Sequence, residues 1–250
     1  EGMDSYKKAK FLSRLSSIRY RLKETPKALD LVSKALWTAQ SIKDPDKKAF
    51  ALKDVALAYS SMNNRLISMF VENQINQTKN PITLMEIASD YIDASESSSA
   101  ERFLNTAKSR AEKESDLKLK SKMLYDAAEI YSLLNKKKTS QDCANLSLNA
   151  SKLIQSRVDR INGMIRANNI FKSDDVYSTA LQEIILVNEY YVKVRMMLDI
   201  SSGYMTMGLK DKGFFLVKVI LGELKKNGDA EQLEKVLEKI SDIYTEYGNE

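Results

Sequence analysis

The segment Met123–Asn135, MLYDAAEIYSLLN, carries a spacing of residues that recurs along most of this chain of 250 residues. An apolar residue is followed three and four positions later by apolar or small residues, at position seven by tyrosine, and at position eleven by a residue that ends a helix. In this segment the pattern consists of Leu124, Ala127, Ala128, Tyr131 and Asn135. Because offsets of three, four and seven return to one side of an α-helix, this tyrosine pattern predicts a helix with one buried face.

Six more copies of the tyrosine pattern can be recognised. Four keep the tyrosine: Leu52, Val55, Ala56, Tyr59, Asn63; Leu84, Ile87, Ala88, Tyr91, Ser95; Met197, Ile200, Ser201, Tyr204, Gly208; and Leu237, Ile240, Ser241, Tyr244, Gly248. Two lose it: Leu12, Leu15, Ser16, Arg19; and Ile161, Met164, Ile165, Asn168. The copies begin 32 to 40 residues apart. This period is typical of stacked helical hairpins.

The composition agrees with an all-α protein. Eight glycines and three prolines are few for this length, and no segment alternates as a strand does. Pro26, Pro45 and Pro81 stand where helices are expected to begin, the position at which a missing N–H does least harm. Each of the first six copies is followed by a second amphipathic segment, such as residues 25–42. We therefore expect helical hairpins throughout.

The expected organisation is a single domain over residues 3–250. It contains six hairpins and a C-terminal capping helix, at approximately residues 8–43, 46–79, 81–116, 119–156, 158–193 and 195–228, with the cap at 230–248.

These offsets resemble those of tetratricopeptide repeats (TPR). The resemblance covers residues 8–248 and includes a small residue that opens the second helix of a unit, at Ala28, Ser68, Ala100, Ser140 and Gly213. The usual Trp and Gly of the first helix are replaced by Leu or Met and by Ala or Ser. The resemblance implies an all-α, right-handed superhelical solenoid. A general helical solenoid or an irregular α-bundle is the structural alternative.

The resemblance also implies a function, because the first helices of TPR proteins line a concave groove that binds an extended peptide or a partner helix. The matching offsets give a set of groove-facing residues: Lys122, Tyr125, Glu129 and Ser132; Asp159, Asn162, Arg166 and Asn169; and Arg195, Leu198, Ser202 and Met205. Asn162, Arg166 and Asn169 form one polar stripe, suited to a peptide backbone and a carboxylate. Ser13 and Ser17 stand where the Lys and Asn of the chaperone-binding carboxylate clamp would fall.

The residue types argue against catalysis. The chain has no histidine, which excludes Ser/His/Asp and Cys/His catalytic units and a histidine metal site. The single cysteine, Cys143, lies on an apolar helix face and is interpreted as a core residue. Gly203 and Gly208 are spaced like the start of a phosphate-binding loop, but Leu209 and Lys210 follow instead of Lys and Ser or Thr. We predict a protein-binding scaffold that is not an enzyme, with no catalytic residue, metal or cofactor.

The two ends of the chain carry opposite charges. Residues 1–23 have a net charge of +5 and residues 229–250 a net charge of −5. Lys7, Lys10, Arg14 and Arg21 share one helical face. This charge asymmetry has three interpretations: two solvated end helices, head-to-tail association of copies, or an anionic partner at the basic end.

A helical-repeat protein that binds nucleic acid through this basic helix is the alternative function. A net charge of only +5, with no aromatic residues alternating with the basic ones, makes nucleic acid the less favoured partner. The apolar runs IILV at 184 and FFLV at 214 are too short to cross a bilayer, so no membrane partner and a cytoplasmic location are expected.

Overall fold

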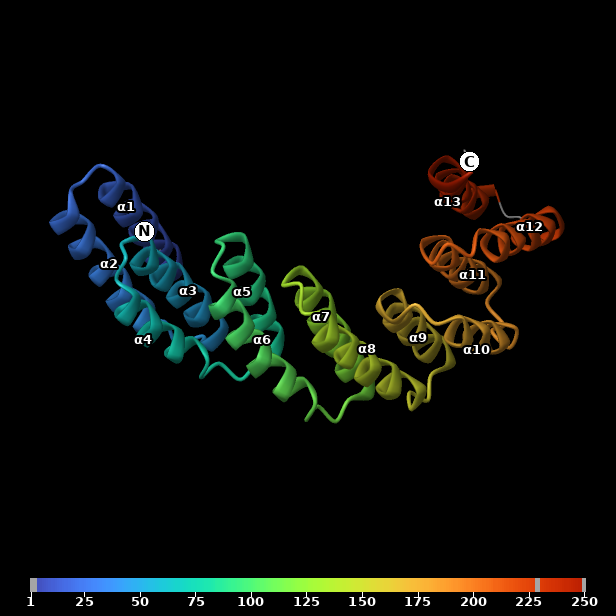
Figure 1. Ribbon diagram of the computed structural model, residues 1–250, viewed down its shortest axis with the longest axis horizontal. Coiled ribbons are helices and arrows are strands. Elements are labelled where there is room, and N and C mark those ends of the chain that lie inside the picture. Colours follow the sequence, from blue (N-terminus) through green and yellow to red (C-terminus); the bar gives the residue numbers. More distant parts are fainter. Residues whose placement is uncertain (1–3, 228–229, 249–250) are drawn as a thin grey trace. The chain divides into compact units, whose positions relative to one another are not determined.

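The computed structural model describes residues 4–227 and 230–248, and in these residues all regular secondary structure is α-helical (Figure 1). The all-α prediction is confirmed for this part of the chain. The helices are α1 (Ser5–Arg21), α2 (Thr25–Gln40), α3 (Pro45–Ser61), α4 (Arg65–Ile75), α5 (Pro81–Asp93), α6 (Ser97–Ala111), α7 (Leu117–Leu133), α8 (Lys137–Lys152), α9 (Arg157–Phe171), α10 (Asp174–Ile184), α11 (Tyr190–Thr206), α12 (Lys210–Asn227) and α13 (Ala230–Tyr247).

Contacts between residues divide the chain into two compact units. The first comprises residues 1–113 and 129–137, and the second comprises residues 114–128 and 138–250. In the first unit α1 packs on α2, α3 on α4 and α5 on α6, as hairpins that are visible in Figure 1. The first helices of these hairpins also contact one another in series, α1 on α3 and α3 on α5.

The second unit repeats this arrangement. Helix α9 packs on α10 and α11 on α12, while α9, α11 and α13 contact one another in series. Hydroxyl groups join α7 to α8, since Ser121 Oγ lies 2.6 Å from Ser151 Oγ and Ser147 Oγ donates to the Ser121 carbonyl at 2.8 Å. The predicted packing of consecutive helices is therefore observed in both units.

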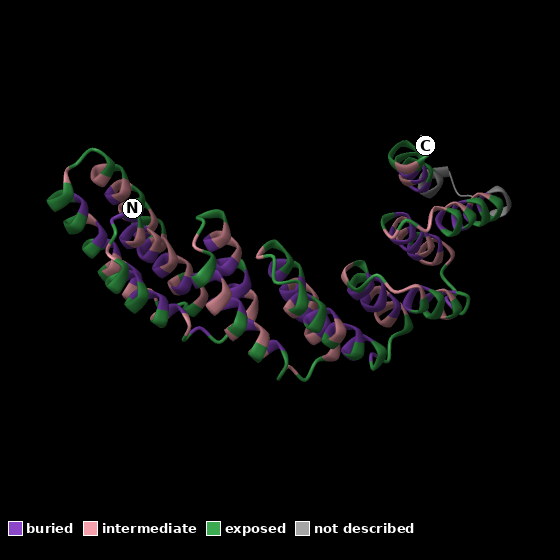
Figure 2. Ribbon diagram, in the orientation of Figure 1, coloured by how far each residue is buried: buried purple, intermediate pink, exposed green. Residues whose placement is uncertain are grey.

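The tyrosine pattern forms the buried side of the first helices. Tyr59, Tyr91, Tyr131 and Tyr204 are buried, whereas Tyr244 on α13 is 40% exposed. In Figure 2 the buried residues of each hairpin lie mainly where its helices meet, and the exposed residues lie on the other side. The prediction of buried tyrosines is confirmed for four copies and wrong for the fifth. Tyr244 stacks on Phe214 of α12, but no later hairpin among the described residues covers its other side.

Small residues allow the two helices of a hairpin to approach closely. Ser68 Oγ donates to the Ala56 carbonyl at 2.9 Å, and Ser140 Oγ donates to the Ala128 carbonyl at 2.7 Å. In α11 the direction is reversed, because Ser201 Oγ donates to the carbonyl of Gly213 at 2.9 Å. The hydroxyl in each case satisfies a backbone acceptor on the other helix of the hairpin.

The residues at position eleven of six copies adopt a left-handed backbone, which ends the helix. They are Lys23, Asn63, Ser95, Asn135, Lys172 and Gly208, with φ between 56° and 76°. This conformation costs an L-residue other than Asn or Asp about 1–2 kcal/mol, so the chain geometry imposes it at the two lysines. At the other end of helices, Pro26, Pro45 and Pro81 lie in the first turn, as predicted.

Among the described residues, every helix is too short or too polar to span a bilayer.

Candidate functional site

A groove between α11 and α13 is the surface on which predicted binding residues meet. It has a volume of about 450 Å³. Arg195 and Leu198, both predicted to face a groove, line it on α11. The other lining residues are Tyr191, Val192, Lys235, Val236 and Lys239.

The groove has an apolar floor and cationic edges. Leu198 and Val236 are buried and form part of the core between α11, α12 and α13. Arg195 is exposed and forms no salt bridge with any described residue. Lys239 forms an ion pair with Asp199, which partly neutralises its charge. A ligand that combines apolar side chains with carboxylates fits these surroundings.

The polar stripe on α9 is partly occupied by contacts within the protein. Asn169 Oδ1 accepts a hydrogen bond from Tyr177 Oη at 2.9 Å. Asp159 forms a salt bridge with Lys118 at 2.7 Å, and this hydrogen-bonded pair lowers the pKa of the Asp159 carboxyl, with a smaller contribution from the charge of Arg166. Arg166 is exposed and Asn162 is half-buried. Of this stripe, Arg166 and Asn162 keep side chains suited to binding a partner.

Of the remaining predicted groove residues, Ser202 and Met205 lie on α11. Ser202 is half-buried, and Met205 is buried in the core between α11, α12 and α13. The others lie on α7, where Ser132 is exposed. Lys122 and Glu129 are exposed and Tyr125 is half-buried.

The predicted basic patch lies on the exposed side of α1. Lys7, Arg14 and Arg21 are exposed, and Lys10 is half-buried. Three apolar residues alternate with them on the same side, because Phe11, Ile18 and Leu22 are 55%, 52% and 63% exposed. Sequence reasoning found the charges but not the apolar row, since exposure depends on which helix neighbours α1.

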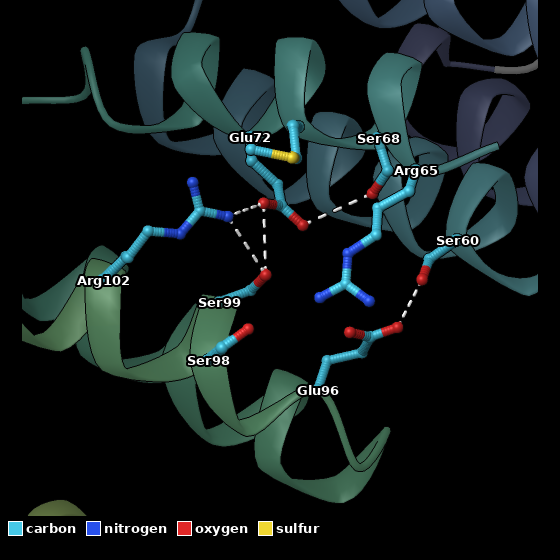
Figure 3. A pocket seen from close by; sticks show the side chains of 9 residues that line it. Ser60, Arg65, Ser68, Glu72, Glu96, Ser98, Ser99 and Arg102 are labelled. Carbon is cyan, nitrogen blue, oxygen red and sulfur yellow. Dashed lines mark hydrogen bonds and ion pairs between the residues drawn. The ribbon is translucent and has the colours of Figure 1, made fainter. Parts of the chain in front are cut away.

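A second pocket, of about 300 Å³, lies where the N-terminal ends of α4 and α6 meet (Figure 3). The Glu72 carboxylate is buried in its wall and accepts hydrogen bonds from Ser68 Oγ at 3.3 Å and Ser99 Oγ at 3.2 Å. Arg102 completes the set with a salt bridge to Glu72. Figure 3 also shows Arg65 extending across the pocket toward Glu96.

Tyr91 is fully buried near this cluster. Burial raises the pKa of its hydroxyl far above the ordinary value, and the negative charge of Glu72 raises it further. Among the described residues, Tyr91 Oη has no hydrogen-bond partner. The raised pKa keeps the phenol neutral beside the Glu72 carboxylate.

Sequence reasoning did not identify the α4–α6 pocket, although one signal was present. Glu72 lies four residues after Ser68 on the second helix of its hairpin. The residues at the equivalent position of the five other hairpins are small or apolar: Val32, Leu104, Ala144, Leu181 and Val217. A carboxylate at such a position must be paired to be buried at moderate cost. Its partner Arg102 is 30 residues away, so spacing alone cannot identify it.

The described residues contain no cluster of three or more Cys, Asp or Glu side chains placed to hold a metal ion. A comparison with protein-family models finds no match, and a comparison with curated proteins also finds none.

Proposed function

We propose that this chain is a TPR-like solenoid that works as a non-enzymatic scaffold and binds acidic, apolar peptides in the groove between α11 and α13. The superhelical arrangement is part of the proposal. It is supported by the serial contacts of first helices within each unit and by the recurrent left-handed residue that ends them.

The α11–α13 groove is the observation that carries the proposed function. A preformed groove loses little ordering entropy when a peptide binds. The apolar floor of Leu198 and Val236 favours Leu or Phe side chains, and Arg195 presents a planar donor pair to a carboxylate. An extended peptide suits this site, because its alternate side chains point to opposite sides and allow apolar residues to face the floor.

Fluorescence anisotropy with labelled peptides tests the proposal. The probes are short synthetic peptides in which Glu and Leu alternate, and the matched control peptides carry Lys in place of Glu. We expect saturable binding of the acidic peptides and none of the basic ones. Arg195→Ala removes a charge-assisted contact worth about 1.5–3 kcal/mol, so affinity is expected to fall at least about tenfold.

Lys152→Ala is the matched control variant, because Lys152 is an exposed cation on α8, outside the groove. It is expected to leave affinity unchanged. Arg166→Ala tests whether binding extends along α9. Asn169 is left intact there, since replacing it would remove the acceptor of the Tyr177 hydroxyl. Equal affinity of the Arg195→Ala variant and the unmodified chain would contradict the groove assignment.

The basic, exposed side of α1 makes nucleic acid the second candidate partner. Binding to phosphates falls steeply with salt, because counterions are released on association. Titration with mixed oligonucleotides at about 0.05 M and about 0.5 M NaCl distinguishes the two candidates. A steep salt dependence that is lost in Arg14→Ala with Arg21→Ala would favour nucleic acid.

A further inference from the structure

Cations from two helices line the groove between α11 and α13. Arg195 comes from α11, and Lys235 and Lys239 come from α13. Arg195 and Lys235 occupy the same position of the tyrosine pattern, two residues before its first member, on helices that contact each other. The described residues that line the groove include no acid. An anion in this groove can therefore be contacted from both helices at once.

A phosphate group uses such an arrangement more fully than a carboxylate does. The two oxygens of a carboxylate can be occupied by the guanidinium of Arg195 alone, as a parallel pair of hydrogen bonds. A phosphate monoester has three terminal oxygens and carries about 1.5 to 2 negative charges at pH 7. It can therefore accept from Arg195 on one helix while the ammonium of Lys235 contacts it from the other.

The acids near the groove are placed so that its cationic lining is kept. Asp199 on α11 is paired with Lys239 and offsets part of the charge of that lysine. Several acids on helices that contact α11 form salt bridges elsewhere: Asp159 with Lys118, Asp174 with Lys212, and Glu183 with Arg160. On α13, three exposed acids are not part of the lining: Glu234, Glu238 and Asp242. Glu223 on α12 acts on Tyr190, the pKa of which is raised first by burial and then by this charge.

The floor of the groove favours a peptide as the carrier of the phosphate. Leu198 and Val236 are buried aliphatic residues, against which Leu or Phe side chains next to the phosphate can pack. A single-stranded nucleic acid would instead need aromatic rings on which its bases stack. Among the described lining residues Tyr191 is the one aromatic side chain, and its ring already packs edge-to-face on Tyr190 with centroids 5.1 Å apart.

We infer that the segment bound between α11 and α13 carries a phosphorylated serine or threonine flanked by apolar residues. This inference rests on the proposed function, because it identifies the anion that the same groove binds. Arg195, Lys235 and Lys239 contact the phosphate, and the flanking side chains cover Leu198 and Val236. Affinity then depends on whether the partner is phosphorylated.

Fluorescence anisotropy with three matched peptides tests the inference. The first is the labelled peptide in which Glu and Leu alternate, and in the other two its central Glu is replaced by phosphoserine or by serine. At pH 7 the phosphoserine peptide is expected to bind at least about fivefold more tightly than the Glu peptide. The serine peptide is expected to bind more weakly than either.

The pH dependence of binding separates a phosphate from a carboxylate. The second pKa of phosphoserine is about 6, so the fraction of dianion rises about tenfold between about pH 5 and about pH 7. Affinity for the phosphoserine peptide is expected to rise about fivefold over this range, and affinity for the Glu peptide to change less than about twofold. The protein adds no histidine titration, because the chain contains no histidine.

Lys235→Ala tests the contact from the second helix. It is expected to lower affinity for the phosphoserine peptide at least about fivefold and affinity for the Glu peptide less than about twofold. The exposed Lys152 on α8 again provides the control, since Lys152→Ala is expected to change neither affinity. The far-ultraviolet circular dichroism of both variants is expected to match that of the unmodified chain, because both lysines are exposed.

The possible failures point to different errors. If the phosphoserine and Glu peptides bind equally and independently of pH, the inference is wrong and the proposed function stands. If none of the three peptides binds, both are wrong. If an equal concentration of unlabelled mixed oligonucleotide displaces the phosphoserine peptide at about 0.15 M NaCl, the groove binds nucleic-acid phosphates and the assignment to a peptide is overturned.

Discussion

The α5–α6 and α9–α10 hairpins place a tyrosine at their helix contacts by different routes. In the first, Tyr91 comes from the first helix and its ring centroid lies 5.1 Å from that of Phe103 on α6. In the second, position seven holds Asn168, and Tyr177 comes from the second helix. Tyr177 packs edge-to-face on Tyr204 of α11, again with centroids 5.1 Å apart. Both tyrosines are fully buried.

In the α9–α10 hairpin the second helix thus supplies the buried tyrosine that the first helix lacks. Room for Tyr177 is provided by Gly203 on α11, since a Cβ atom at Gly203 would lie 2.6 Å from Cε2 of the Tyr177 ring and still closer to its hydroxyl oxygen. Asn168 has meanwhile taken a different role. Its Nδ2 donates to the Ser173 carbonyl and its Oδ1 accepts from Ser173 N–H, both at 2.8 Å, which fixes the turn into α10.

The largest predicted difference in stability is between variants of Tyr91, which is buried, and of Tyr244, which is partly exposed. Tyr91→Ala leaves a cavity between α5 and α6 and is expected to lower the free energy of unfolding by about 3–5 kcal/mol. Tyr244→Ala removes a side chain that is already 40% exposed and is expected to cost less than about 1 kcal/mol in the monomer. Urea unfolding of both variants, followed by circular dichroism, measures the difference. Equal losses would show that position seven has no special role.

The next effect on stability concerns the α9–α10 hairpin, in which the buried tyrosine comes from the second helix. Gly203→Ala forces the Tyr177 ring to move and is expected to cost about 1–3 kcal/mol. Gly222→Ala on α12 is the matched control, because a Cβ atom at Gly222 would meet no side chain or neighbouring backbone within 4 Å. That substitution is expected to be neutral or to stabilise by up to about 1 kcal/mol, since glycine is unfavourable inside a helix.

The double variant Gly203→Ala with Tyr177→Leu sharpens this test. Leucine vacates the space that the new methyl group needs, so the two losses are expected to be less than additive. Additive losses, measured by the same urea titrations, would place the cost of Gly203→Ala somewhere other than at Tyr177.

The smallest predicted effect concerns how the first helices end. Lys172 closes α9 with φ of 56°, and Asn135 follows α7 with φ of 58°. Lys172→Gly is expected to stabilise by about 0.5–1 kcal/mol, because lysine is strained in this conformation. Asn135→Gly is expected to change stability less, since asparagine tolerates it. Thermal unfolding of the two variants compares them, and a larger gain at Asn135 would contradict the backbone-strain explanation.

The buried positions that recur along the sequence could be predicted, whereas contacts that belong to one particular hairpin could not. It placed Tyr59, Tyr91, Tyr131 and Tyr204 in the core, because offsets of three, four and seven define a helix side. It could not predict that Tyr177 replaces the missing tyrosine of α9, since that substitution depends on the space left by Gly203 in another hairpin. The exposure of Tyr244 likewise depends on the neighbours of α13 and not on its own sequence.

The residues of the candidate binding site could likewise be predicted only in part. Arg195 and Leu198 were predicted from their offsets and do line a groove, but the α13 residues that complete it come from 40 positions further along the chain. Asn169 was predicted to bind a partner, and its side-chain oxygen Oδ1 accepts the hydroxyl hydrogen of Tyr177. Spacing along one helix identifies the exposed side but not the neighbour that uses it.

Nuclear magnetic resonance of the Gly203 Hα protons tests most directly the central claim that neighbouring hairpins join around a buried tyrosine. The structure predicts strong Overhauser contacts from these protons to the Tyr177 ring. It also predicts chemical shifts displaced by the ring current, which return toward ordinary values in Tyr177→Leu. Gly203 protons with no contact to Tyr177, and with shifts unchanged by that substitution, would contradict the account.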